Sequence, residues 1–147
     1  MTDYKHILIP VDFSQACKQV IDRAISVADK YKASINMLHV VEYLPPLDFG
    51  YETVSTPSLY GVEEEIIKHA SKNLEQLAAE YSIATANTSV VMGTPKTEII
   101  RFANQHEIDL IVIGSHGRHG IQRLLGSTAY PVTHNADCDV LAIRIKD

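Results

Sequence analysis

Short apolar runs alternate with longer segments of helical periodicity along this chain of 147 residues, and this alternation restricts the fold more than any other feature. The apolar runs are rich in β-branched residues, which favours strands. The segments between them repeat their apolar residues every three or four positions, which favours helices. Regular alternation of this kind predicts parallel strands joined by crossover helices. We expect strands at 6–11, 34–41, 88–92, 110–113 and 139–145, and helices from 16 onward, over 63–81, from 95 onward and at 126–134.

The predicted fold is α/β, a single domain over residues 1–147 with an open, Rossmann-like parallel sheet of five strands and helices on both faces. The run LIVIG at 110–114 agrees with this fold, because an unbroken apolar run suits a strand that is buried on both faces. Ligands of such sheets bind beyond the carboxyl ends of the strands, where the strand order reverses. A site is therefore expected around Asp12, Val41, 92–94 and the segment from Gly114 onward.

The charge and cysteine content exclude several classes of function. The chain carries 13 Lys and Arg against 18 Asp and Glu, a formal net charge of −5, whereas a general nucleic-acid binder needs a basic face. Its two cysteines, Cys17 and Cys138, match no disulfide framework and predict reduced thiols. The start of the sequence has no signal-peptide core, and no apolar run has the length of a membrane span. We expect a cytoplasmic protein that binds neither nucleic acid nor membranes.

The segment 111–128, IVIGSHGRHGIQRLLGST, combines glycines, cations and hydroxyls directly after a predicted strand. Glycine lets backbone N–H groups approach an anion closely and adopts the positive φ that such loops need. Gly126, Ser127 and Thr128 are expected to open a helix, whose free amides, dipole and hydroxyls favour phosphate. Arg118 would add a charge-assisted contact. The alternative is a turn whose glycines only permit tight packing, and the spacing by itself favours neither.

Two common nucleotide motifs are incomplete in this sequence. The first predicted strand leads into PVDFSQ rather than into a glycine-rich dinucleotide fingerprint, and the pair Gly126-Ser127 lacks the lysine of a Walker A loop. Asp12 has no visible partner that would make it a catalytic base, and Cys17 has no assignable histidine that would make it a nucleophile. We assign no catalytic residue.

A zinc pattern can be written from four residues, His116, His119, His134 and Cys138. The first two lie in the glycine-containing loop and His134 lies on a predicted helix, so the spacing matches a zinc finger only loosely. Histidines that bond to backbone, water or phosphate explain the pattern better, and we expect no metal site. His39 is expected to be a strand residue whose ring has a hydrogen-bond partner.

The full chain resembles the universal stress protein family. The resemblance rests on HILIPVDFS at the start, LHVVE at the second strand, VVMGTP at the third, and IDLIVIGSHG with a later GS near the end. It implies an open five-stranded sheet with the strand order 3-2-1-4-5 and a dimeric assembly. Many members of that family bind ATP through a loop of the pattern G-x2-G-x9-G-[ST].

The resemblance also implies which residues would hold ATP, with Mg²⁺. Gly114, Gly117 and Gly126 match the three glycines of the loop and Ser127 matches its hydroxyl, while adenine and ribose would lie at Asp12 and the ends of the second and third strands. The chain departs from the pattern by having eight residues rather than nine between Gly117 and Gly126. The predicted nucleotide-binding set is Pro10, Asp12, Val40, Val41, Met92, Gly93, Gly114, Gly117, Arg118, Gly126, Ser127 and Thr128.

Three functions are open from the sequence. We expect a dimeric stress protein that binds ATP and works as a sensor or adaptor. The alternative is a dimeric interaction scaffold of the same fold that binds no nucleotide. An enzyme that acts on ATP is the third, limited to slow hydrolysis, because the sequence shows no acid, base or metal carboxylates for phosphoryl transfer. The apolar strand at 139–145 lacks proline and forms a bare edge, so it is the expected surface of a homodimer.

Overall fold

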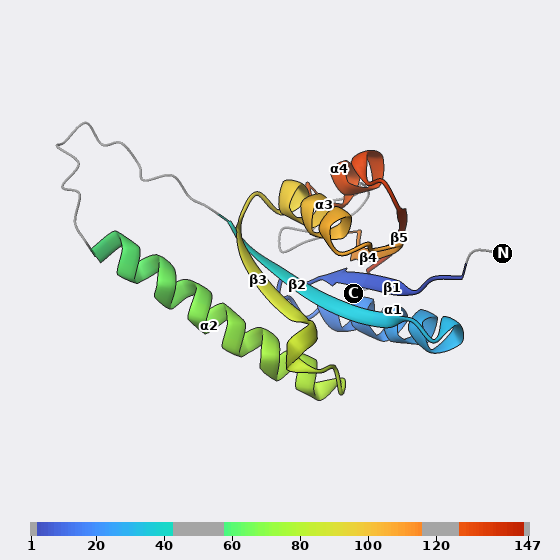
Figure 1. Cartoon of the computed structure of the whole chain (residues 1–147), viewed down its shortest axis with the longest axis horizontal. Helices are drawn as coiled ribbons and strands as arrows, with labels where there is room; N and C mark the ends of the chain where they lie inside the picture. The colour runs from blue at the N-terminus through green and yellow to red at the C-terminus, as the bar shows by residue number, and fades with distance from the viewer. Residues whose placement is uncertain (1–2, 43–57, 116–126, 146–147) are drawn as a thin grey trace.

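The computed structural model contains one open sheet of five parallel strands in the order β3-β2-β1-β4-β5, which confirms the predicted fold class and strand order (Figure 1). The structure describes residues 3–42, 58–115 and 127–145. Each strand lies within two residues of its expected bounds. The strands are β1 (His6–Pro10), β2 (Ser34–Glu42), β3 (Thr88–Gly93), β4 (Leu110–Gly114) and β5 (Asp139–Ile143), and the helices are α1 (Cys17–Tyr31), α2 (Ser58–Glu80), α3 (Pro95–Gln105) and α4 (Ala129–Asn135).

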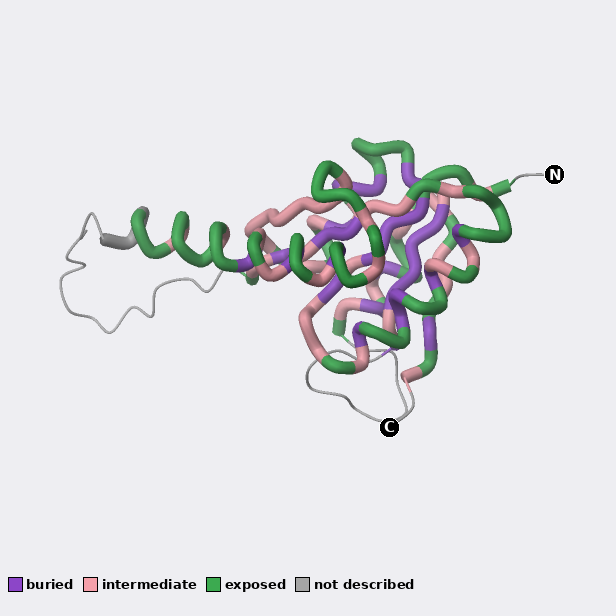
Figure 2. Tube along the Cα trace, turned by 90° about the horizontal axis from the view of Figure 1, so that it is seen from below, coloured by how far each residue is buried: buried purple, intermediate pink, exposed green. Residues whose placement is uncertain are grey.

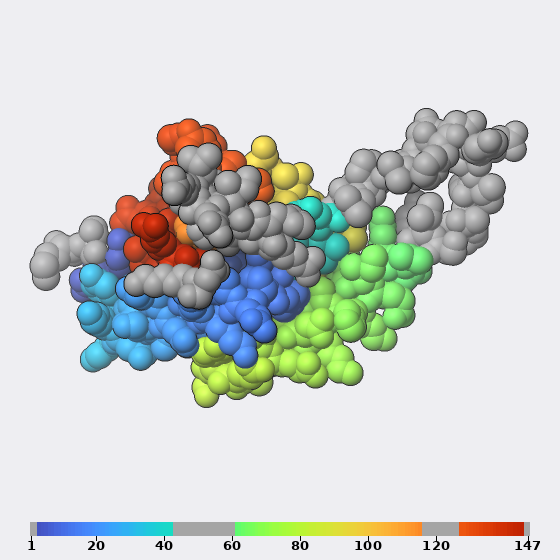
Figure 3. Space-filling model, turned by 180° about the vertical axis from the view of Figure 1, so that it is seen from behind, coloured from blue at the N-terminus to red at the C-terminus, as the bar shows by residue number. Residues whose placement is uncertain are grey.

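Two hydrophobic cores lie on opposite faces of the sheet. Ile7 and Ile9 of β1 pack with Val20 and Ile21 of α1 and with Leu74 of α2, whereas the intervening residues of the strands face the other core. Helices α1 and α2 therefore cover one face, and α3 and α4 cover the other (Figures 1 and 3). The second core consists of Leu8, Leu38, Val40, Ile99, Phe102, Ala103, Ile108, Ile111, Ile113, Ala129 and Val132.

Helix α2 is attached to the sheet through its carboxyl-terminal half only. Ala70, Leu74 and Ala78 are buried, whereas Val62 and Ile66 are 52% and 44% exposed. The amino-terminal turns extend beyond the sheet (Figure 2). The helix begins at Ser58, five residues before the expected start. Three glutamates at 63–65 would have occupied the first turn of a helix that began at residue 63. They lie further along the helix, where the dipole of the helix end has less effect.

The predicted helix start at 126 was also wrong. Helix α4 begins at Ala129, Thr128 is its N-cap residue, and Ser127 lies in the preceding turn. The expected start of α3 is confirmed, with Thr94 at the N-cap and Pro95 in the first turn. Pro131 is the third residue of α4 and has no N–H, so this helix offers fewer free amides than most.

Side-chain hydrogen bonds stabilise the amino-terminal edge of the sheet. The Asp109 carboxylate accepts the amides of Lys5 at 2.8 Å and His6 at 3.1 Å, one on each oxygen. The Tyr4 hydroxyl donates to Asp139 at 2.8 Å, and this bond together with burial raises the pKa of Tyr4. The acidic groups at this edge therefore serve the ends of the strands. Within the described ranges, no helix combines the length and apolar character needed to cross a membrane.

The two halves of α2 predict different responses to truncation. Leu74 is fully buried and Ile66 is 44% exposed on the same helix. We expect Leu74→Ala to lower the free energy of unfolding by about 2–5 kcal/mol, because it leaves a cavity in the core. Ile66→Ala is expected to change it by about 0.5 kcal/mol or less. Urea titration of both variants measures this, and equal losses would show that the protruding half also packs in a core.

Candidate nucleotide-binding site

The carboxyl ends of the strands gather most of the predicted site residues at one edge of the sheet. Because all five strands are parallel, β1 ends at Pro10, β3 at Gly93 and β4 at Gly114 on this same edge. The strand order reverses between β1 and β4, which is where ligands bind in open sheets of this class. Three predicted residues, Gly117, Arg118 and Gly126, lie outside the described residues.

Asp12 lies in a tight turn directly after β1. Its Oδ1 accepts the amide of Ser14 at 3.0 Å and the hydroxyl of Ser14 at 2.6 Å, so the carboxylate stabilises the turn that carries it. Among the residues that the structure describes, no hydrogen bond to Oδ2 is found. A partly buried carboxylate with one oxygen fixed in place can accept a hydroxyl or amine from a ligand with the other.

The backbone of Val40 points toward the point where the strand order reverses. The carbonyl of Leu38 accepts the amide of Val11 at 2.8 Å and therefore faces β1. Alternate residues of a strand direct their backbone groups to the same side, so the N–H and C=O of Val40 face the space beyond the end of β1. A donor and an acceptor on one residue match the hydrogen-bonding edge of a purine. The backbone of Val41 faces β3 instead, by the same alternation.

His39 has the hydrogen-bond partner that the sequence analysis expected. Its Nδ1 lies 2.7 Å from the carbonyl oxygen of Val11, and its ring lies 4.4 Å from the ring of Phe13. A carbonyl oxygen can only accept, so Nδ1 carries the proton of this bond. The side chain therefore contacts the residues on both sides of Asp12.

The Cys17 thiol is not suited to nucleophilic catalysis. It lies in the first turn of α1 and is 5% exposed. Burial, followed by the nearby charge of Asp12, raises the pKa of Cys17 to about 11. The thiolate, which is the reactive form, is therefore scarce at neutral pH.

Gly93 fixes the turn between β3 and α3. Its φ of +154° is disfavoured for other residues, and an added Cβ would lie 2.7 Å from Cγ of Glu98. The Glu98 side chain is 14% exposed and pairs with Arg101 at 2.7 Å. Glycine thus lets the buried stem of Glu98 pack against the backbone at the mouth of the site.

A hollow of about 270 Å³ lies at this edge between the β3–α3 turn and the start of α4. Gly93, Ser127 and Thr128, all predicted site residues, contribute to its wall, with Thr94 and Pro95 beside them. This volume lies near the lower end of the range for ligand pockets, about 300 Å³, and suits one part of a nucleotide.

Two charged residues of this hollow were missed by the sequence analysis. Glu42, the last residue of β2, pairs in register with Gly93, and Lys96 lies in the first turn of α3. The sequence contained a clue to these two residues, because each of them follows the carboxyl end of a predicted strand. The sequence does not say which loops meet across the edge, and only the strand order brings the β2 end and the α3 start together.

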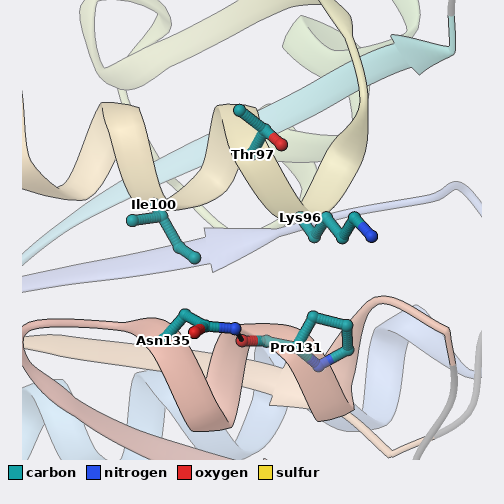
Figure 4. Close-up of a pocket in the computed structure, with 5 residues that line it drawn as sticks. All are labelled: Lys96, Thr97, Ile100, Pro131 and Asn135. Atoms are coloured by element: carbon teal, nitrogen blue, oxygen red, sulfur yellow. Dashed lines mark hydrogen bonds between the residues drawn. The ribbon is translucent and has the colours of Figure 1, made fainter.

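A second hollow of about 300 Å³ adjoins the first, because Lys96 borders both. It lies between α3 and α4, where Ile100 points toward the residues Pro131 and Asn135 of α4 (Figure 4). The Asn135 amide donates to the carbonyl of Pro131 at 2.8 Å, so this side chain is already engaged within its own helix. Ile100 and Pro131 form the apolar part of the wall of this hollow, and Lys96 and Thr97 are polar residues at its α3 side.

The end of β4 is anchored to β5. The amide of Ser115 donates to the carbonyl of Ile143 at 2.8 Å, and the Ser115 hydroxyl accepts the amide of Ile145 at 3.4 Å. Ser115 is buried, which is unusual for a polar residue outside a core. The chain therefore enters the segment after Ser115 from a fixed point next to the end of β1.

Comparison with known proteins gives a consistent result. The model of the universal stress protein family matches residues 3–144. Universal stress protein A homolog 1 of Coxiella burnetii is 39% identical over 144 residues, which covers 98% of this chain and 99% of the relative. The structure of UspA from Lactobacillus plantarum is 33% identical, has a TM-score of 0.75 and covers 98% of this chain and 100% of its own.

One further similar structure is that of a universal stress protein in complex with cAMP. It is 23% identical to this chain, has a TM-score of 0.61 and covers 97% of this chain and 98% of its own. At this identity the likeness shows the fold alone.

The turn at Gly93 yields a prediction with a matched control. We expect Gly93→Ala to lower the free energy of unfolding by about 1–3 kcal/mol, because alanine is strained at this φ and displaces Glu98. At Gly61 an added Cβ meets no atom within 4 Å, and alanine there is expected to be neutral or to stabilise α2 by up to about 1 kcal/mol. Chemical denaturation of both variants measures this. Equal effects at the two positions would contradict the strained turn.

Proposed function

As the chain belongs to the universal stress protein family, we propose that it binds ATP with Mg²⁺ at the carboxyl edge of the sheet and works as a dimeric sensor or adaptor in the cytoplasm. One observation carries the proposal: Asp12, the Val40 backbone, Gly93 and the pair Ser127-Thr128 lie along the edge where the strand order reverses. In sheets of this class, nucleotides bind to polar groups at this edge.

The adenosine part of the ligand is assigned to the ends of β1 and β2. The backbone N–H and C=O of Val40 would pair with the adenine edge, and Oδ2 of Asp12 would accept a ribose hydroxyl. Pro10 and Val41 would flank the base, and Met92 with Gly93 would border it from β3. The similar structure with cAMP gives general support for an adenine nucleotide, since that protein carries the same fold.

The phosphates are assigned to the residues before α4. Ser127 and Thr128 border the hollow, and Lys96 lies on its wall from α3. A lysine and two hydroxyls are suited to bind phosphate oxygens. Gly114, Gly117, Arg118 and Gly126 complete the proposed phosphate loop.

We propose binding rather than efficient hydrolysis. Burial raises the pKa of Cys17, which lies near the site, and Asp12 is held in its own turn by Ser14. The proposed consequence of binding is a change at the surface around the loop, which a partner protein would read.

The proposed dimer pairs two copies through β5, the edge strand next to β4. The carbonyl of Ile143 faces β4, because it accepts the amide of Ser115. By alternation, the backbone groups of Val140 and Ala142 face away from the sheet and are free to form a ladder with a second copy. Ile143 itself is 8% exposed and belongs to the core, so a dimer is better probed at Ala142.

Titration calorimetry with Mg²⁺ and ATP tests the proposed ligand. We expect a dissociation constant in the micromolar range or weaker, corresponding to about −8 kcal/mol or less favourable. Asp12→Ala is expected to weaken binding by about tenfold or more, because a hydrogen bond to a charged group contributes about 1.5–3 kcal/mol. Asp109→Ala is the matched control, since this carboxylate serves the opposite edge of the sheet.

The outcome separates the candidate functions. Binding that is lost in Asp12→Ala and retained in Asp109→Ala supports the proposal. No heat and no thermal shift at millimolar ATP would overturn it in favour of a scaffold that binds no nucleotide.

The proposed dimer is tested by sedimentation of the wild type and of Ala142→Pro. Proline removes an N–H that faces outward, so the variant is expected to be a folded monomer, while Ala142→Ser is expected to remain a dimer. A wild type that sediments as a monomer at tens of micromolar would contradict this interface.

A further inference from the structure

Strand β1 ends where a side chain takes over a backbone hydrogen bond. The amide of Val11 donates to the carbonyl of Leu38 at 2.8 Å, as in a regular parallel ladder. In such a ladder the carbonyl of Val11 would next accept the amide of Val40. The imidazole of His39 donates to this carbonyl instead, with Nδ1 2.7 Å from the oxygen. The chain can therefore leave the sheet at Val11 without leaving its carbonyl unpaired.

The turn that follows is one that the chain would not adopt unaided. Phe13 has a φ of +62°, in the left-handed region that residues with a Cβ disfavour. Such a conformation persists only when the surroundings hold it. The Phe13 ring lies against the His39 ring at 4.4 Å, and the amide of Ser14 is bound by Oδ1 of Asp12.

We infer that His39 is a positioning residue of the nucleotide site, a role that rests on the proposed function. One imidazole contacts Val11 before Asp12 and Phe13 after it, and so fixes the turn from both sides. Asp12 between them is held with one oxygen bound to Ser14 and its carboxylate at the site edge. Because the imidazole occupies the Val11 carbonyl, the amide of Val40 also stays available to the ligand.

The chain offers a matched control for this role. His106 makes the same pair of contacts, with Nδ1 3.0 Å from the carbonyl of Phe102 and its ring stacked on the Phe102 ring at 3.8 Å. It lies at the carboxyl end of α3, close to the start of β4 and so at the opposite edge of the sheet. Removal of either imidazole therefore breaks similar interactions, but only one of them adjoins the proposed site.

The test measures MgATP binding by calorimetry and stability by urea titration for His39→Leu, His39→Asn and His106→Leu in the full chain. We expect His39→Leu to weaken binding by about five- to tenfold, the factor for one ordinary hydrogen bond. Asparagine keeps a donor near the position of Nδ1, so His39→Asn is expected to restore affinity to within about threefold of the wild type. His106→Leu is expected to lower stability to a similar extent as His39→Leu but to leave the affinity unchanged.

A second readout follows the turn without nucleotide. The amide of Ser14 is expected to exchange its hydrogen faster in His39→Leu than in the wild type, and to be unchanged in His106→Leu, because His39 contacts the turn and His106 lies at the opposite edge of the sheet.

The outcomes distinguish this inference from the proposed function. A wild type that binds no ATP overturns the proposed function, and the positioning role with it. A wild type that binds ATP with an affinity that His39→Leu leaves unchanged overturns the positioning role alone. Equal losses of affinity in His39→Leu and His106→Leu would also overturn it, because they would trace to stability in general.

Discussion

Burial of the central strands on both faces is the constraint on which the rest of this structure depends. Ile7, Leu8 and Ile9 of β1 and Ile111 and Val112 of β4 have no exposed surface. Residues buried in this way need helices above and below them, and every backbone group along them must be paired in the ladder. These central strands can present unpaired polar groups to water only where they end. The position of the candidate site is therefore a consequence of how the apolar surface is buried.

The two edges of the sheet use their polar residues differently. At the amino edge, Asp109 binds two backbone amides and Tyr4 binds Asp139, so these side chains close the structure. At the carboxyl edge, Glu42 and Lys96 face a hollow. Charged and hydroxyl side chains that do not bind the backbone at strand ends remain available to bind a ligand. This asymmetry, more than any single motif, supports a site at the carboxyl edge.

The sequence predicted the fold well because its signals were local and numerous. Apolar runs such as 110–114 show directly that a strand is buried on both sides, and the periodicity of α1 and α3 marks their buried faces. The strand order followed from family resemblance rather than from periodicity, since alternation alone does not say which strands are neighbours.

The details that could not be predicted either depend on contacts between distant segments or concern the exact ends of helices. The start of α2 at Ser58 and of α4 at Ala129 differ from expectation because helix ends are weakly encoded and depend on neighbouring elements. Glu42 and Lys96 meet only after the sheet has formed. The role of His39 depends on a carbonyl 28 residues earlier in the chain, so the sequence pattern could place this histidine on a strand but could not identify its partner.

The measurement that tests the account most directly is a ¹H–¹⁵N NMR titration of the full chain with MgATP. The account predicts shifts at Asp12, Ser14, Val40, Gly93 and Ser127, with the amides of Lys5 and His6 at the opposite edge unchanged. Saturable shifts confined to the amino edge, or no shifts at millimolar MgATP, would contradict it.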